Sequence, residues 1–499
     1  MHSHNLQRIA AASVACLWSL LTACAAGQQT GSTQEQAALP VAAAKNVILF
    51  IGDGMGVSTV TATRILDGQR KGMQGEGNVL PFERFPYLAL SKTYEVNQQV
   101  GESAGTATAL LTGNKTRAGM LGVSKDAERK NCASANGNRL VSALELAEAD
   151  GRSTGVVTTT RLTHATPAAA YAHVPERNWE SDRDLSDEAV QNGCTDIAAQ
   201  LIEFPYGDGI EVALGGGRIK FLPFDVADPE GANTADARLD GRNLPQEWLQ
   251  KYPHSAYVWN LQQFDAIDPQ STDHLLGLFE SDHMHFEADR ADDIAGEPSL
   301  AQMTRLAIEI LRRNPKGYFL LVEGGRIDHA HHDNNAYRAL TDGIALADAV
   351  AVADEMTRED DTLIVVTADH SHTFTIAGYS ARGNPILGKA VYNDSEGQPE
   401  AGPKLMGDQK PFTTLGYYIG PGAAWVGGAR PDLSDTDTAT DKDFVQQAAI
   451  PAEDDTHGGE DVPVYARGPG AQNLHGVIEQ DEIFRVIDRA AHLSQDTQN

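Results

Sequence analysis

Residues 319–334 read FLLVEGGRIDHAHHDN and place many potential metal ligands directly after an apolar run. Glu323 lies at the end of that run, and the next ten residues include two aspartates and three histidines. Carboxylate oxygens and imidazole nitrogens together form a ligand set that suits zinc. Asp328 and His332 are four residues apart, so they share one face if this turn is helical. The stretch predicts metal chemistry at a strand end.

Three other stretches carry the same types of side chain. Asp53 lies between glycines in IGDGMG, Asp369 and His370 follow the apolar start of VVTADHSH, and His457 lies in the acidic stretch DDTHGGED. Taken singly, these are ordinary turn residues, loop residues or a solvated acidic loop. Because similar side chains recur after several apolar runs, we expect them to form one metal centre.

Ser103 begins a run of small residues, SAGTATALL, that leads into a predicted helix. A serine at such a position is ordinarily an N-cap. A helix N-terminus also binds phosphate well, and a serine hydroxyl beside zinc can lose its proton and act as a nucleophile. Both interpretations stay open at this point.

The elements that position these residues are typical of an α/β fold. Continuous apolar runs at 46–54, 155–167, 318–325 and 362–372 resemble strands buried on both sides of a parallel sheet. Helical patterns such as LVSALELAEADG and SLAQMTRLAIEILRRNP lie between them. In such folds, ligands bind beyond the carboxyl ends of the strands. We therefore expect a large three-layer α/β/α sandwich with a mainly parallel central sheet.

One region departs from this alternation. From 378 to 442 the composition changes to Gly, Pro, Asp and Tyr, with short strand-like pieces such as FTTLGYYIG and AAWVGG. We interpret it as an inserted, loop-rich subdomain in a fold that begins near residue 45.

The charge and the N-terminus restrict partners and location. The 499 residues include 69 acidic and 39 basic ones, a formal charge of −30 that repels nucleic acid. One arginine precedes an apolar stretch at 9–23, too short for a membrane span but suited to a signal peptide. LTAC resembles a bacterial lipoprotein box, which makes 1–24 the signal peptide and Cys24 a lipidated membrane anchor; ordinary cleavage after Ala25 is the alternative.

The protein is therefore expected to be exported, to the periplasm or the cell surface. Residues 25–44, rich in Gln, Ala, Ser and Thr, are expected to form a flexible tether. Outside the export segment only Cys132 and Cys194 remain, and an exported protein most simply pairs them.

Six motifs together resemble those of the alkaline phosphatases, most closely the branch that includes the animal enzymes. GDGMG, ESAGTATALLTG, THATPAAAYAHVPERNW, FLLVEGGRIDHAHH, VVTADHSH and DTHGGEDV occur in the order and approximate spacing of that family. The resemblance covers residues 45 to about 489 and makes 45–499 a catalytic domain. It implies broad hydrolysis of phosphate monoesters at alkaline pH, through a phosphoserine intermediate, by a homodimer.

The resemblance also implies roles for individual residues. Ser103 would be the nucleophile, Arg177 would clamp the phosphate, and Glu102 would orient Arg177. The metal ligands would be Asp328, His332 and His457 for one zinc, Asp53, Asp369 and His370 for a second zinc, and Asp53, Thr166 and Glu323 for magnesium. Three more residues of the stretch 319–334 would not bind the catalytic metals. His329 would lie behind the ligands, and His331 and Asp333 would bind no catalytic metal.

Two departures from the family pattern stand out. Glu102 replaces the usual Asp, and its extra methylene would shift Arg177 and weaken phosphate binding. His164 and His329 stand where the best-known bacterial relatives carry Asp and Lys, and they match the animal branch. We expect these histidines to tune the third metal and phosphate release.

Further matches concern the surface and the loops. Cys132 and Cys194 match a disulfide of the animal enzymes, the region 378–442 matches their crown, and Tyr379 matches a residue that reaches the partner subunit. A calcium site is implied by Glu230, the carbonyl of Phe279, Glu280 and Glu297, the last in place of a usual Asp. Phosphodiester or sulfate-ester hydrolysis is one alternative function, and a lipoprotein that binds metal or phosphate without turnover is another.

Overall fold

A computed structural model describes residues 43–494 of the chain. The expected signal peptide (1–24), its Cys24 and nearly all of the expected tether (25–44) lie outside the described residues. The strands are β1 (Asn46–Gly52), β2 (Tyr87–Lys92), β3 (Ser153–Arg161), β4 (Val212–Gly216), β5 (Ser255–Val258), β6 (His274–Leu278), β7 (Tyr318–Gly324), β8 (Thr362–Ala368), β9 (Ser371–His372), β10 (Phe374–Ile376), β11 (Leu415–Gly420), β12 (Ala448–Pro451), β13 (His457–Gly458), β14 (Val462–Arg467) and β15 (Gly476–Glu479). The α-helices are α1 (Val57–Arg70), α2 (Ser103–Thr112), α3 (Cys132–Ala135), α4 (Ala143–Ala149), α5 (Ala165–Ala168), α6 (Asp187–Gln191), α7 (Ile197–Glu203), α8 (Leu244–Lys251), α9 (Leu261–Asp265), α10 (Leu300–Leu311), α11 (Arg326–His332), α12 (Ala336–Met356) and α13 (Asp481–Ala491).

A ten-stranded sheet forms the centre of the fold, in the order β15-β2-β14-β8-β1-β7-β3-β4-β6-β5. Its strand pairs are parallel except those that β14 makes with β2 and β8. The four apolar runs predicted as strands are β8, β1, β7 and β3, which lie side by side. The predicted mainly parallel sheet is confirmed. One run was too long: β3 ends at Arg161, and 165–168 turns into α5.

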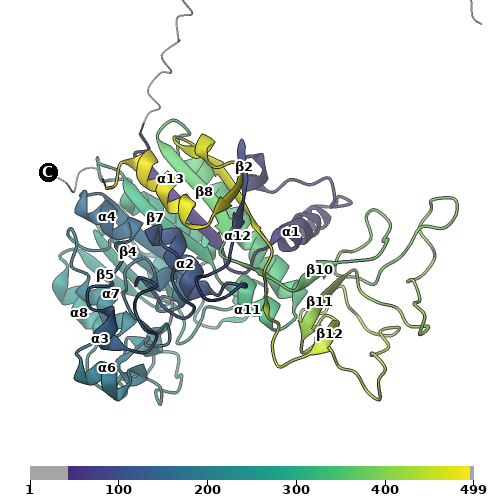
Figure 1. The fold of residues 1–499 in the computed structure, drawn as a ribbon, viewed down its shortest axis with the longest axis horizontal. Helices are drawn as coiled ribbons and strands as arrows, with labels where there is room; N and C mark the ends of the chain where they lie inside the picture. Colours follow the sequence, from purple (N-terminus) through teal and green to yellow (C-terminus); the bar gives the residue numbers. More distant parts are fainter. Residues whose placement is uncertain (1–42, 495–499) are drawn as a thin grey trace, which may run out of the picture. The chain divides into compact units, whose positions relative to one another are not determined.

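Helices cover both faces of this sheet. In β1, Val47, Leu49 and Ile51 belong to one buried apolar cluster, whereas Ile48 and Phe50 belong to a second. Alternate residues of a strand point to opposite faces, so the sheet has a core on each side. Helices α2, α4 and α13 contribute to the first core (Figure 1), and α10 and α12 contribute to the second. The predicted α/β/α sandwich is therefore confirmed.

The parallel strands bring distant residues to one edge of the sheet. Gly52 at the end of β1 pairs with Gly324 of β7 on one side and with Ala368 of β8 on the other. Asp53 and Asp369, the next residues of β1 and β8, consequently emerge together. Glu323, in β7, lies beside them in register with Ile51. The carboxyl edge thus collects side chains that are about 300 residues apart in the chain.

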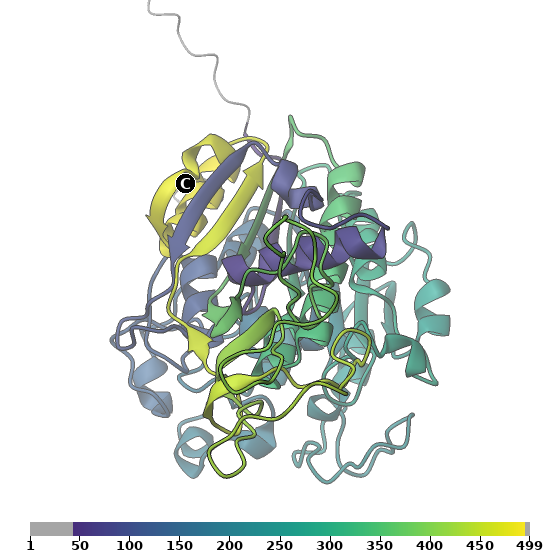
Figure 2. The ribbon, with the colours of Figure 1, turned by 90° about the vertical axis from the view of Figure 1, so that its right-hand side faces the viewer.

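A second sheet has the strand order β10-β11-β12 (Figure 2). Its middle strand, β11, belongs to the loop-rich region, and the other two strands flank that region in the sequence. Leu415 and Tyr417 of this sheet form a buried cluster with Ile65 of α1 and Leu340 of α12, which attaches the region to the core. The expected strand at 423–428 is wrong, because Val426 makes only an isolated bridge with Ala429. Two glycines with positive φ, Gly427 and Gly428, turn the chain between them.

A disulfide joins Cys132, at the start of α3, to Cys194, beyond α6, as the sequence predicts. The bond closes a loop with a sequence separation of 62 residues. Within residues 43–494, no helix combines the length and the apolar character needed to cross a bilayer.

We expect the double variant Cys132→Ser/Cys194→Ser to unfold about 2–5 kcal/mol more easily than the wild type, because a cross-link across a long loop restricts the unfolded chain. Urea unfolding of both proteins under oxidising conditions measures this difference. Reduced wild-type protein is the control and should match the variant. Identical unfolding midpoints in all three samples would contradict the prediction.

Candidate active site

The first candidate metal group lies at the ends of β1 and β8. Asp53, Asp369 and His370 are each buried, and one donor atom of each lies within 4.8 Å of the others. His370 Nε2 lies 3.3 Å from Asp53 Oδ1 and 3.2 Å from Asp369 Oδ2. Burial lowers the pKa of His370 to about 3, so the imidazole is neutral and can donate a lone pair to a metal.

Ser103 lies beside this group at the start of α2. Its Oγ is 3.3 Å from His370 Nε2 and 3.5 Å from Asp53 Oδ1, and the residue is 2% exposed. The N-cap interpretation of Ser103 is wrong, because the cap is Glu102, whose carboxylate accepts hydrogen bonds from the backbone N–H groups of Ala104 and Gly105. The hydroxyl of Ser103 is therefore directed at the metal group instead of the helix backbone.

A second group contains Asp328 and His332 of α11 and His457 of β13. The Nδ1 atoms of His332 and His457 lie 2.7 and 2.9 Å from the carbonyl oxygens of Asp455 and Gly101. Because a carbonyl only accepts, each Nδ1 carries the proton and each Nε2 carries a lone pair. The two Nε2 atoms face each other at 3.2 Å, and Asp328 lies 3.4 and 3.5 Å from them. Two facing lone pairs beside a carboxylate are the arrangement that a cation requires.

His372 belongs to the same group of potential ligands, and the sequence predicted no role for it. Its Nε2 is 2.6 Å from Asp328 Oδ1 and its Nδ1 is 3.0 Å from Asp455 Oδ2. Burial alone would lower the pKa of His372, but Asp328 and Asp455 raise it to about 9. His372 therefore donates to both carboxylates and orients Asp328. The sequence did offer one signal for this role, the position of His372 two residues after His370.

A third group lies between β1, β7 and α5. Asp53 Oδ2, Glu323 Oε1, Thr166 Oγ1 and His164 Nδ1 are buried and lack a hydrogen-bond partner among the described residues. Burial, together with the charges of neighbouring carboxylates, raises the pKa of Asp53 well above its ordinary value. Several unpaired buried donors and acceptors around one place fit a bound cation. His164, expected to lie behind the ligands, is itself close enough to bind that cation.

The other residues of the opening stretch do not join these groups. His329 Nδ1 lies 2.9 Å from Arg326 Nη1, and its ring lies 5.4 Å from that of His164. The nitrogens of His331 lie 2.8 Å from the Tyr417 hydroxyl and 2.9 Å from Thr59 Oγ1, so its hydrogen-bonding capacity is used inside the core. Asp333 is exposed at the end of α11.

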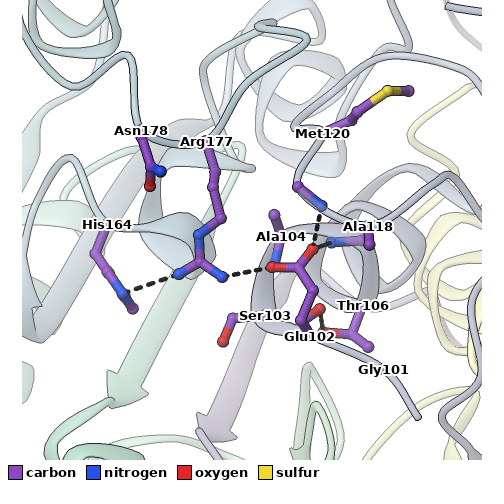
Figure 3. A network of polar contacts seen from close by, with 12 residues as sticks. Gly101, Glu102, Ser103, Ala104, Thr106, Ala118, Met120, His164, Arg177 and Asn178 are labelled. Carbon is purple, nitrogen blue, oxygen red and sulfur yellow. Dashed lines mark hydrogen bonds and ion pairs between the residues drawn. The ribbon is translucent and has the colours of Figure 1, made fainter. Parts of the chain in front are cut away.

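Arg177 extends over Ser103 and is held from two sides (Figure 3). Its Nη1 forms an ion pair with Glu102, and its Nη2 lies 3.0 Å from His164 Nε2. Burial alone would raise the pKa of Glu102, but the Arg177 charge and three backbone N–H groups lower it to about 2. The extra methylene of Glu102 therefore still allows the contact with Arg177 while the same carboxylate caps α2.

We expect Glu102→Gln to raise KM for a phosphate monoester about tenfold, with a smaller change in kcat. The variant removes the charge that holds Arg177, and a hydrogen bond to a charged group contributes about 1.5–3 kcal/mol. Steady-state kinetics on an aryl phosphate measures the effect. Glu102→Asp keeps the charge and should stay nearer the wild type. A KM for Glu102→Gln equal to that of the wild type would contradict this role.

The residues expected to bind calcium are only partly brought together. Glu280 and Glu297 lie in one group with His285 and Asp293, neither of which was predicted. The Glu230 carboxylate instead forms an ion pair with Arg218. Tyr379 is 84% exposed in the loop-rich region.

His283 was also missed, although ESDHMH directly follows the apolar run that ends in Phe279. Its ring lies 4.3 Å from that of His329 and 5.4 Å from that of His164. Both ring nitrogens lie close to Arg161, at 3.1 Å from the backbone N and 2.6 Å from Nη1. Two histidines, His283 and His329, thus lie beside His164 and behind the third group.

The three groups surround a serine at a helix N-terminus with an arginine above it. Helix N–H groups and a guanidinium both bind phosphate oxygens, and a buried hydroxyl between metal ligands is positioned to attack. The arrangement suits transfer of a phosphoryl group to serine.

Comparisons with known proteins agree with this chemistry. A family model described as alkaline phosphatase matches residues 44–493. The tissue-nonspecific alkaline phosphatase of Felis catus is 48% identical over 454 residues, which cover 90% of this chain and 83% of that protein. An alkaline phosphatase of Gadus morhua is 46% identical over 458 residues, covering 91% of this chain and 92% of the other.

The fold has solved counterparts as well. The crystal structure of Thermus thermophilus alkaline phosphatase superposes with a TM-score of 0.63 at 24% identity, covering 95% of this chain and 96% of that chain. At this identity the likeness concerns the fold alone.

Proposed function

This chain belongs to the alkaline phosphatase family and hydrolyses phosphate monoesters, and we propose that Ser103 is the nucleophile. The observation that carries the proposal is the position of the Ser103 hydroxyl. It lies at the N-terminus of α2, within 3.5 Å of both His370 Nε2 and Asp53 Oδ1, and the helix is capped by Glu102 instead.

The donor sets support two zinc ions and one magnesium ion. Asp53, Asp369 and His370 would hold one zinc, and Asp328, His332 and His457 the other, since mixed imidazole and carboxylate sets suit that ion. Asp53, Glu323 and Thr166 offer oxygen atoms of the kind that magnesium prefers. When bound, these ions would supply positive charge for the entering and leaving oxygens and lower the pKa of the serine hydroxyl.

The protein's own residues would bind and orient the substrate. Arg177 would hold two phosphate oxygens through its guanidinium, and Glu102 would keep that guanidinium in place. Ser103 Oγ would form a bond to phosphorus as the ester oxygen leaves with the alcohol. Water would then break the phosphoserine bond and release phosphate. His164, which contacts Arg177, and His329, whose ring lies 5.4 Å from that of His164, would influence how that phosphate leaves.

A substrate panel tests the proposal. The full-length enzyme, stripped by a chelator and reloaded with zinc and magnesium, is assayed at alkaline pH with aryl phosphate, aryl phosphodiester and aryl sulfate. We expect fast release from the monoester and loss of activity after stripping. Faster turnover of the diester or the sulfate, or activity indifferent to the chelator, would contradict the assignment.

We further propose that the loop-rich region pairs two copies of the chain. Tyr379, Tyr418, Trp425 and Val426 expose between 50% and 84% of their surface there, and aromatic side chains are enriched at protein interfaces. A second copy is therefore the proposed occupant. Sedimentation equilibrium should give twice the chain mass, and a monomeric mass would contradict the proposal.

Export and lipid attachment through Cys24 remain proposals that rest on the N-terminal sequence. Membrane association should be lost in Cys24→Ser, and equal association in both proteins would contradict lipidation.

A further inference from the structure

The loop between β6 and α10 carries a fourth group of metal-ligand side chains. Glu280, His285, Asp293 and Glu297 each place one donor atom within 4.8 Å of the others. His285 Nδ1 lies 3.3 Å from Glu280 Oε1 and 3.6 Å from Glu297 Oε1. None of these residues belongs to the groups around Ser103, so they form a separate place in the fold.

Buried carboxylate oxygens in this group lack partners. Glu297 is 1% exposed, and its Oε2 has no hydrogen-bond partner among residues 43–494. Asp293 Oδ2 is likewise buried and unpaired within the same range. The other oxygens of the two carboxylates are engaged, Glu297 Oε1 by the backbone N–H of His285 and Asp293 Oδ1 by that of Ala295. A buried oxygen without a partner is costly, and here both residues belong to one group of potential metal ligands. This arrangement calls for a cation.

The composition of the group argues against calcium. Calcium binds six to eight oxygen ligands in proteins. Here His285 contributes a nitrogen, and Glu230 is paired with Arg218, a fully buried arginine that also binds Asp228. One oxygen of Glu230, Oε2, is thereby engaged by Arg218.

The spacing agrees with a smaller ion. Four ligands bound tetrahedrally to zinc at about 2.0–2.2 Å lie about 3.3–3.6 Å apart, which matches the two measured separations from His285. We propose that Glu280, His285, Asp293 and Glu297 bind a zinc ion in place of the calcium that the family resemblance implies.

A metal here would join the two ends of a loop that reaches the active site. Glu280 lies at the start of the loop and Glu297 near its end, and His283 lies between them against His329. The ion therefore fixes the segment that presents His283. The proposal stands independently of the role of Ser103.

Metal content tests the proposal directly. The full-length protein is stripped with a chelator, reloaded with Zn²⁺ in the presence of excess Ca²⁺, dialysed, and analysed for both metals. We expect His285→Ala and Glu297→Gln each to contain about one zinc fewer per chain than the wild type. His475→Ala, which changes an exposed histidine outside all four groups, should keep the wild-type content.

Equal zinc content in the wild type and both variants would overturn the proposal, as would one calcium per chain replacing one zinc. Should the variants fail to fold, anomalous diffraction from wild-type crystals at the zinc edge decides the question, with a peak expected beside His285 Nδ1 and Glu297. Activity measured in the same samples separates this site from the proposed function, because an inactive wild type that keeps the extra zinc would refute only the latter.

Discussion

Replacing Ser103 by alanine is expected to lower kcat/KM for phosphate monoesters by at least about 10³-fold, the scale seen when hydrolases lose a nucleophile. The Ser103 hydroxyl lies between His370 and Asp53, and Arg177 is held close by. Steady-state kinetics with an aryl phosphate measures this loss of kcat/KM. The variant should retain its zinc content, since Ser103 is not required to hold the metals.

Two controls make this result specific. Ser395→Ala changes an exposed serine of the loop-rich region and should behave as the wild type. Brief incubation with labelled substrate, followed by acid quenching, should leave label on wild-type protein and none on Ser103→Ala. Undiminished turnover by Ser103→Ala, or label on the variant, would contradict the nucleophile assignment.

Asp53→Asn is expected to cost a comparable factor, about 10³-fold or more, together with bound metal. Asp53 is the one carboxylate that belongs to both the first and the third group among the described residues. Its loss weakens two sites at once, and a catalytic metal contributes several kcal/mol to the transition state. Metal analysis and kcat/KM are measured together, and Asp435→Asn, an exposed aspartate, serves as control.

The metal-free proteins provide an independent readout. Burial, and then the charges of Asp369, Asp328 and Glu323, raise the pKa of Asp53. The folded state therefore binds the proton more tightly than the unfolded state, and stability falls as pH rises through and above the ordinary carboxyl pKa. Metal-free Asp53→Asn lacks this penalty, so at about pH 8 it should resist urea better than the metal-free wild type. Unchanged metal content in the variant would contradict the ligand role.

Much of the fold followed from local sequence. Runs such as NVILFIG and TLIVVTA are apolar at every position, and such runs form strands with both faces buried. Their ends were visible because glycine or charge follows at once. Two strand predictions were wrong, the extension of β3 beyond Arg161 and the strand at 423–428. Both places contain β-branched or apolar residues that favour a strand, but no partner strand among the described residues lies beside them.

The capping of α2 shows a limit of local reasoning. Serine is a better N-cap than glutamate by preference, yet Glu102 caps the helix. Its carboxylate is also fixed by Gly119 and Arg177, which are 17 and 75 residues away in the chain. Those distant contacts decide which side chain turns toward the helix backbone.

The sequence by itself determined the alkaline phosphatase resemblance, the parallel sheet, the pairing of Cys132 with Cys194, and most of the candidate metal-ligand residues, because these depend on residue type and order. Only the tertiary structure decided which further side chains join or support those sites. It directed His372 to two carboxylates, placed His164 within reach of the third group, and gathered His285 with Glu280 and Glu297. These outcomes depend on distances between residues that the chain brings together only after the strands have paired, and so no single stretch of sequence contains them.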